Sequence, residues 1–184
     1  LKISAEKIIA NTAYRFEKMP VYISGNDETY IKKVEDFFIK KYLEIGFSVF
    51  NKIDKIDNYT QSNNLFNNKQ INILYNISGV GKNEINSLLK NEDYLIISAK
   101  NTPKDKGLKN LFKNEHSFLL IECYKLSRQS KSTVLNYFFE KKKIKIDKEV
   151  YWYLLENLND QYAFLSKDLD KISLAEKKIN DINF

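Results

Sequence analysis

Short apolar runs recur along the chain up to residue 122, and each is bounded by Gly, Asn, Asp or Lys. Each run has four or five residues, many of them β-branched or aromatic, a composition typical of β-strands. The last two runs are apolar on both faces, which predicts a mostly parallel sheet covered by helices on both sides. The runs span residues 20–24, 47–50, 71–75, 94–98 and 118–122.

The stretches between these runs carry apolar residues at helical spacing. The longest such stretch, residues 28–45, has a candidate N-cap at Asp27 and ends at Gly46. Shorter helices are expected over residues 58–68, 83–89 and 107–112. Strands that alternate with helices predict an α/β layered domain, which we place at residues 1–125.

The pattern changes after Tyr124, where no further strand run of comparable strength occurs. Apolar residues at helical spacing instead predict three helices, over residues 130–140, 147–158 and 162–174. We therefore expect a second, small three-helix domain over residues 126–184.

Composition narrows the chemistry. The chain has one Cys and one His, which excludes a disulfide scaffold and a Cys-cluster zinc site, and we predict no metal or catalytic site. A net charge of +6, from 30 basic and 24 acidic residues, permits a nucleic-acid or acidic partner without establishing one. No apolar run approaches the ~20 residues of a membrane span, and the start lacks a signal-peptide core, so we expect a reduced, cytoplasmic setting.

The loops that could bind phosphate are both defective. The loop after the first predicted strand, Ser24–Glu28, has one Gly, no Lys and two carboxylates, which would repel a phosphate. Gly79–Lys82 is similar to the end of a phosphate loop, but Asn76 and Asn83 stand where Gly and Ser or Thr are needed. The chain is therefore expected to be an α/β protein without a bound nucleotide cofactor.

Other charged or reactive residues have simpler explanations. Arg128 is a candidate arginine finger. The tract Lys141–Lys148 could touch phosphates, but a solvated loop is the preferred interpretation of the tract. His116 and Cys123 flank the fifth predicted strand, where a loop His and a buried Cys are the ordinary interpretation.

The segment 60–69 is unusual because Leu65 and Phe66 are adjacent large apolar residues among polar neighbours. Such a pair can close the core just before a strand, or it can form an exposed plug for an apolar pocket on a partner. Burying both side chains is worth roughly 3–6 kcal/mol. The pattern alone leaves both interpretations open.

Several segments together resemble a known family. These are Tyr22–Glu28, the string Asn64-Leu-Phe-Asn-Asn-Lys-Gln70, Tyr94–Lys100, Phe118–Tyr124 and Leu165–Ile172. Over nearly its whole length, the chain is similar to the delta subunit of the bacterial DNA polymerase III clamp loader. The Leu-Phe-x-x-Lys-Gln string is the most specific part of this resemblance.

The resemblance implies an AAA+-type parallel-sheet domain without a functional phosphate loop, a three-helix lid and a further collar domain. The family contacts the other loader subunits through this collar, and we expect no collar domain within residues 1–184. The family is not an enzyme by itself, but belongs to the holoenzyme that performs nucleotidyl transfer. It inserts a Leu-Phe pair into the sliding clamp and opens the ring.

On this resemblance the clamp-binding residues are Leu65 and Phe66, flanked by Asn64 and Gln61. Clamp-binding peptides often carry Gln three residues before the Leu-Phe pair, whereas here that position is Ser62. DNA is a possible further partner in the full complex, and no membrane partner is expected. Two alternatives are an ATP-hydrolysing AAA+ protein with an atypical site and a basic nucleic-acid-binding domain.

Overall fold

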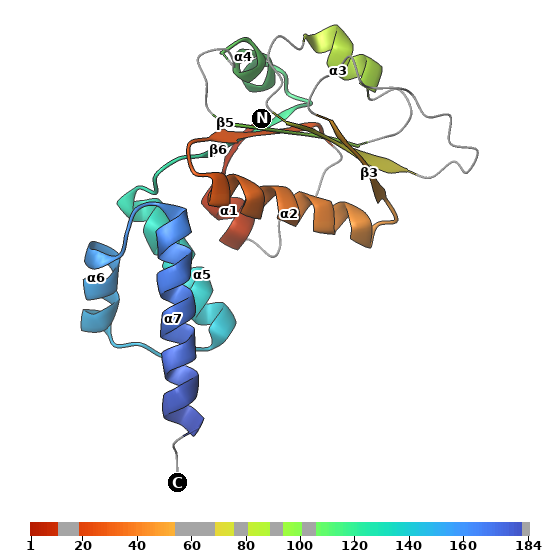
Figure 1. Cartoon of the computed structure of the whole chain (residues 1–184). Coiled ribbons are helices and arrows are strands. Elements are labelled where there is room, and N and C mark those ends of the chain that lie inside the picture. The colour runs from red at the N-terminus through yellow and green to blue at the C-terminus, as the bar shows by residue number, and fades with distance from the viewer. Residues whose placement is uncertain (11–18, 54–68, 76–80, 89–93, 101–105, 182–184) are drawn as a thin grey trace.

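The computed structural model describes residues 1–10, 19–53, 69–75, 81–88, 94–100 and 106–181 (Figure 1). These residues form six strands and seven helices. The strands are β1 (Lys2–Ser4), β2 (Val21–Gly25), β3 (Ser48–Ile53), β4 (Gln70–Tyr75), β5 (Tyr94–Lys100) and β6 (Leu119–Cys123). The helices are α1 (Ala5–Ala10), α2 (Glu28–Glu44), α3 (Lys82–Leu88), α4 (Lys106–Asn114), α5 (Arg128–Lys142), α6 (Lys148–Asn157) and α7 (Tyr162–Asp181).

The strands form one parallel sheet in the order β1-β6-β2-β5-β4-β3. All five predicted strands are present, and each lies within a few residues of its expected position. The central strand β2 is buried along its whole length, as expected for a strand with neighbours on both sides and helices on both faces. The predicted helix over residues 58–68 lies outside the described residues.

Helices cover both faces of the sheet, with α3 and α4 on one side and α1 and α2 on the other (Figure 1). Side chains from alternate strand positions enter two separate cores. Tyr22, Ile97 and Leu120 pack on the α3/α4 side, whereas Val21 and Ile23 pack on the α1/α2 side. The fold class predicted from the apolar pattern is therefore confirmed.

The amino-terminal strand and helix were not expected from the sequence. Strand β1 pairs in parallel with β6, with Lys2 opposite Leu120 and Ile3 opposite Ile121, and extends the sheet by one strand. Helix α1 follows directly and buries Ala5 and Ile8 against the core. A strand of three residues carries too few apolar positions for a periodic signal, so the prediction of five strands was one short.

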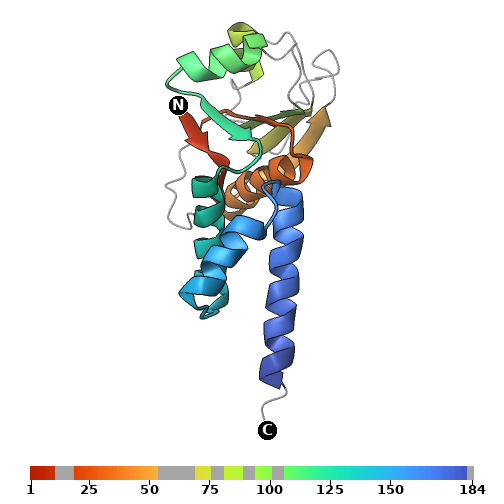
Figure 2. The same cartoon turned by 90° about the vertical axis from the view of Figure 1, so that its left-hand side faces the viewer.

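Helices α5, α6 and α7 form a unit that lies below the sheet, on its α1/α2 side (Figures 1 and 2). The expected three helices are thus present, and α7 runs several residues beyond its expected end. Val134 and Leu165 of this unit belong to the same core cluster as Ile8 and Val34. A continuous core joins the three-helix unit to α1 and α2, and the division into two domains at residue 125 stays a prediction.

Buried Lys131 fixes the geometry inside the three-helix unit. Its ammonium group donates to the Leu158 carbonyl and to Asp160 Oδ1, each at 2.8 Å, although the residue is only 4% exposed. Both acceptors lie in the connection between α6 and α7. A buried charge is tolerated where such partners satisfy it, so this lysine holds the connection against α5.

We expect Lys131→Ala to lower the free energy of unfolding by about 2 kcal/mol, because it removes two charge-assisted hydrogen bonds and strands a carbonyl group. Urea denaturation with an unchanged m-value measures the loss. The matched control is Lys167→Ala on α7, where the side chain is exposed and has no ion pair within the described part of the chain. It should stay within about 0.5 kcal/mol of wild type. Equal losses in the two variants would contradict the assigned role of Lys131.

Candidate functional site

The loop between β2 and α2 occupies the place where a nucleotide-binding sheet holds phosphate. It lies at the carboxyl end of a central strand and leads into a helix N-terminus, whose backbone N–H groups attract anions. In this chain the loop is Asn26–Asp27, between Gly25 and Glu28. What these backbone groups contact decides whether phosphate can bind.

The backbone donors of the loop are turned onto β6. The N–H groups of Asn26 and Asp27 donate to the Cys123 carbonyl oxygen, at 3.2 and 3.4 Å. Gly25 lies so close that a Cβ atom there would stand 1.9 Å from the same oxygen. The loop therefore packs closely against the end of β6. Its two N–H groups are already hydrogen-bonded within the protein and do not point toward a ligand.

The Asp27 carboxylate bridges the N-termini of two helices. It is only 7% exposed; its Oδ1 accepts from the Tyr30 N–H of α2 at 3.0 Å, and its Oδ2 accepts from the Ala163 N–H of α7 at 3.2 Å. Helix N-termini carry partial positive charge, which makes them the natural position for an anion. The protein's own carboxylate occupies that position at both helices.

Two stacked tyrosines close the space beside Asp27. The rings of Tyr30 and Tyr162 lie 4.4 Å apart, centroid to centroid, with an 11° angle between their planes, and both residues are buried. Burial raises the pKa of Tyr162 to about 12 and raises that of Tyr30 as well, so both stay neutral near pH 7. The stack joins α2 to α7 directly beside the Asp27 carboxylate.

A contact from α1 closes the same region from another side. Glu6 accepts a hydrogen bond from Ser130 Oγ of α5 at 2.9 Å and a long one from Tyr30 Oη at 3.5 Å. The three-helix unit is thus tied to both helices beneath the sheet by side chains of this chain.

A buried carboxylate under the sheet was missed by the sequence analysis. Glu35 of α2 is 2% exposed and accepts from Ser98 Oγ of β5 at 2.7 Å, from Tyr75 Oη at 3.1 Å and from Lys32 Nζ at 2.9 Å. Burial raises the pKa of Tyr75 to about 12, so this phenol remains a donor. Three donors satisfy the carboxylate, which makes it a tether between α2 and two strands rather than a free base.

Position 35 carried a signal that could have been used. It falls on the same helical face as the buried apolar residues Ile31, Phe38 and Tyr42, where an acid needs polar partners.

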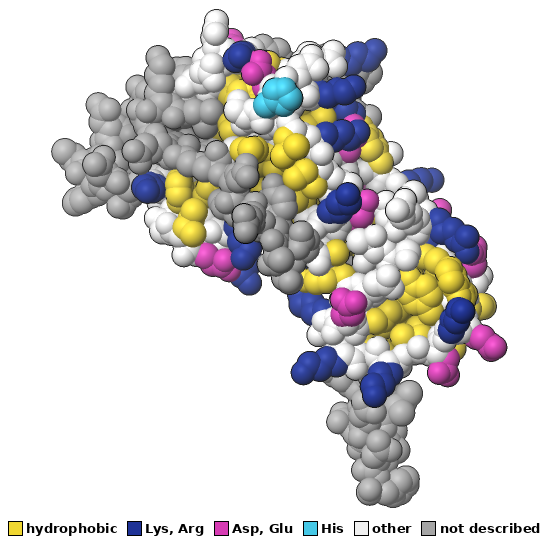
Figure 3. Space-filling view, turned by 180° about the vertical axis from the view of Figure 1, so that it is seen from behind, with side chains coloured by type: hydrophobic (Ala, Val, Ile, Leu, Met, Phe, Trp, Pro, Cys, Tyr) yellow, Lys and Arg dark blue, Asp and Glu magenta, His cyan; other side chains and the backbone are white. Residues whose placement is uncertain are grey.

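The other candidate functional residues are either held in contacts within the protein or lie in environments that do not activate them. Arg128 forms an ion pair with Glu156 and lies over the Trp152 ring, 5.5 Å from its centroid, so it is held within its own unit. His116 is exposed (Figure 3), whereas Cys123 is buried, and burial raises the pKa of its thiol. Neither environment activates a nucleophile.

The second phosphate-loop candidate is also occupied. Lys82 forms an ion pair with Glu115 at 2.8 Å, and the Gly81 N–H donates to the Glu84 carboxylate. Residues 76–80, which would complete the loop, lie outside the described residues. Among the residues that the structure describes, no group of three or more His, Cys, Asp or Glu side chains could hold a metal ion, and no helix is long and apolar enough to cross a membrane.

The predicted clamp-binding residues Leu65, Phe66, Asn64 and Gln61 all lie outside the described residues. In the sequence they belong to the connection between β3, an edge strand of the sheet, and β4. Their role stays a prediction that rests on the resemblance.

Comparison with known proteins places the fold. No protein-family model and no curated protein sequence matches the chain. Among solved structures, AMPPCP-bound DnaA from Aquifex aeolicus gives a TM-score of 0.53 at 17% identity, covering 92% of this chain and 59% of DnaA. The Bacillus subtilis DNA clamp loader delta protein YqeN gives 0.49 at 14% identity, covering 84% of this chain and 53% of YqeN.

This chain therefore spans less than two thirds of the length of either protein. At such low identity the likeness to DnaA shows the fold alone, and it agrees with the AAA+-type α/β class predicted from the sequence. The structural neighbours of the chain are replication proteins of this fold.

Proposed function

We propose that this chain is a non-catalytic subunit of a DNA clamp-loading machine, related to the delta subunit, that binds a sliding clamp and opens or unloads the ring. The observation that carries the proposal is the Asp27 carboxylate at the N-termini of α2 and α7. An AAA+-type fold that places its own carboxylate where the phosphates of ATP would lie is not expected to bind ATP. A role in binding a partner protein is then the remaining function.

The sequence supplies the binding element for that role. Leu65 and Phe66 are adjacent, lie among polar residues and are followed by the Lys-Gln pair that leads into β4. Burying both side chains in a partner's pocket provides roughly 3–6 kcal/mol. If that burial is realised only in the strained form of the clamp, it shifts the clamp population toward the open ring.

This proposal includes partners beyond the clamp. Other loader subunits would be contacted through a collar domain, and the polymerase holoenzyme, rather than this chain, would perform nucleotidyl transfer. DNA would be met only in the full complex, because a net charge of +6 alone is weak support for autonomous DNA binding.

The closed loop predicts the outcome of a nucleotide titration. Mg-ATP or Mg-ADP at up to about 1 mM should leave the melting temperature unchanged, whereas a ligand present at 100 times its Kd adds about 2.7 kcal/mol of stability. Asp27→Ala should lose about 1–2 kcal/mol from two uncapped helix N-termini, without gaining nucleotide binding. Saturable ATP binding by the wild type would favour the alternative of an ATP-hydrolysing AAA+ protein.

The Leu-Phe pair predicts a specific loss of clamp binding. In a titration against the sliding clamp of the same organism, Leu65→Ala/Phe66→Ala should weaken binding at least about 100-fold, because both apolar anchors are removed. The matched control is Phe164→Ala/Leu174→Ala, which truncates the same residue types where they are exposed on α7. That control should bind like the wild type.

The two outcomes that contradict the proposal are distinct. If the folded wild type does not bind the clamp, then the proposed activity is wrong. If binding survives Leu65→Ala/Phe66→Ala, then the partner is retained but the assigned residues are wrong.

A further inference from the structure

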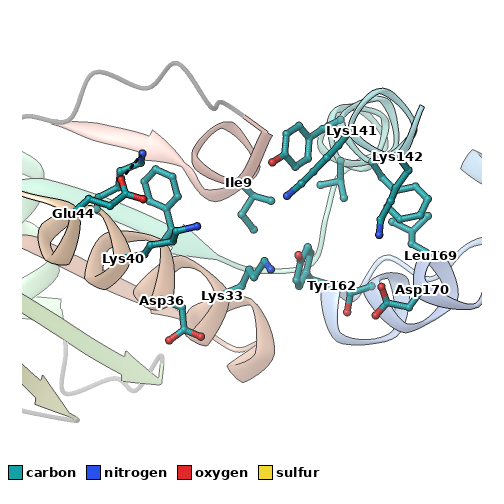
Figure 4. Close-up of a pocket in the computed structure, with 16 residues that line it drawn as sticks. Ile9, Lys33, Asp36, Lys40, Glu44, Lys141, Lys142, Tyr162, Leu169 and Asp170 are labelled. Atoms are coloured by element: carbon teal, nitrogen blue, oxygen red, sulfur yellow. Dashed lines mark hydrogen bonds and ion pairs between the residues drawn. The ribbon is translucent and has the colours of Figure 1, made fainter. Parts of the chain in front are cut away.

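A groove of about 570 Å³ runs between α2 and the three-helix unit (Figure 4). It starts beside Tyr162 and follows α2 away from the Asp27 loop, so it is separate from the closed phosphate position. Its apolar lining comes from α1, α2, α5 and α7: Ile9, Phe37, Val134, Phe138 and Leu169.

Lysines stand on both sides of this groove. Lys33, Lys40 and Lys41 line it from α2, and Lys141 and Lys142 line it from the end of α5 (Figure 4). Lys41 is paired with Glu44 at 3.1 Å, and Lys141 lies over the Tyr137 ring. Lys33, Lys40 and Lys142 have no ion pair within the described part of the chain, so their charge is available to a partner.

The residues that line the groove are spaced so that a partner helix could pack between them. Positions 33, 37, 40, 41 and 44 share one face of α2, and positions 134, 137, 138 and 141 share one face of α5. Two helix faces that border an apolar groove offer ridges into which a third helix can pack. The opposed lysines favour carboxylates along the flanks of that helix.

We propose that this groove binds an acidic amphipathic helix of a partner protein, with apolar side chains on the groove floor and carboxylates between the two rows of lysines. This inference is independent of the proposed clamp binding, which uses residues 61–66 of a different segment.

A nucleic-acid strand fits the groove less well. Asp36, Glu44 and Asp170 are interspersed among the lysines, and they would repel a continuous chain of phosphates. The aromatic rings of Phe37 and Phe138 are half-buried and meet Phe38 and Phe139 edge to face, so they offer no open stacking platform. A mixed rim suits a peptide, whose charges are intermittent.

The test is fluorescence anisotropy with a set of labelled peptides, each a designed amphipathic helix with one apolar face and Glu or Asp on its flanks. The folded protein should bind members of the set with a Kd of about 10–100 µM, and should not bind the same peptides with Lys in place of the acids. Lys40→Glu/Lys141→Glu should weaken binding at least about fivefold, since it reverses one charge on each wall.

The matched control is Lys106→Glu/Lys113→Glu on α4, which changes the net charge equally but lies on the opposite face of the sheet. It should change affinity less than about twofold. Thermal melts establish that each variant folds. If the charge-reversed variant does not fold, then Lys33→Gln/Lys142→Gln tests the same walls by removing charge only.

Three results would overturn the inference. They are no binding of any acidic peptide up to about 1 mM, equal weakening by the groove and α4 variants, and tight binding of a thymidine oligonucleotide that the groove variant alone loses while the peptides stay unbound. The last result would assign the groove to nucleic acid.

Discussion

The rest of the structure depends on one carboxylate placed between two helices. Asp27 caps α2 within the sheet domain and also accepts from Ala163 near the start of α7, 136 residues away in sequence. The first contact is an ordinary N-cap, and the second satisfies an N–H group in the first turn of α7. Because one buried side chain makes both contacts, it helps to fix the angle between the sheet domain and the three-helix unit. The same carboxylate places negative charge at the N-termini of α2 and α7, where an anion would otherwise be favoured, so one side chain contributes both to the packing of the helices and to the electrostatics of the loop.

Two other buried charged side chains also join separate elements of the fold. Glu35 ties α2 to β4 and β5, and Lys131 ties α5 to the connection between α6 and α7. A buried charge is costly unless every partner is in place, so each one penalises arrangements in which its partners separate. In this chain the orientation of the helices is therefore set by its own side chains.

The sequence predicted those parts of the fold that depend on local pattern. Two-sided apolar runs such as 94–98 and 118–122 located their strands, and helical spacing located α2 and the three later helices. Strand β1 was missed because its only evidence is its pairing with β6, which lies more than a hundred residues away. Asp27 was expected as an N-cap of α2, but its bond to Ala163 depends on tertiary packing that no local pattern encodes.

In the candidate site, too, local sequence pattern predicted some features, whereas others depend on tertiary packing. The absence of Lys and the presence of carboxylates after β2 were enough to expect a defective phosphate loop. How the loop is closed, through the Cys123 carbonyl and the Tyr30–Tyr162 stack, required the structure. The Leu65–Phe66 assignment remains a prediction from resemblance, because those residues lie outside the described part of the chain.

Tyr162 belongs both to the lysine-lined groove and to the contacts around the loop between β2 and α2. This ring lines the groove and also stacks on Tyr30, one residue before the Ala163 N–H that Asp27 holds. The separation of the groove walls therefore depends on the same contacts that hold α7 against the loop between β2 and α2. Because the walls are preformed, a partner helix loses only its own freedom on binding, which is the condition under which a small interface retains useful affinity. The groove proposed as a binding site thus borders the same tyrosine stack that packs α7 against α2, and its lysines favour an acidic protein segment as the occupant.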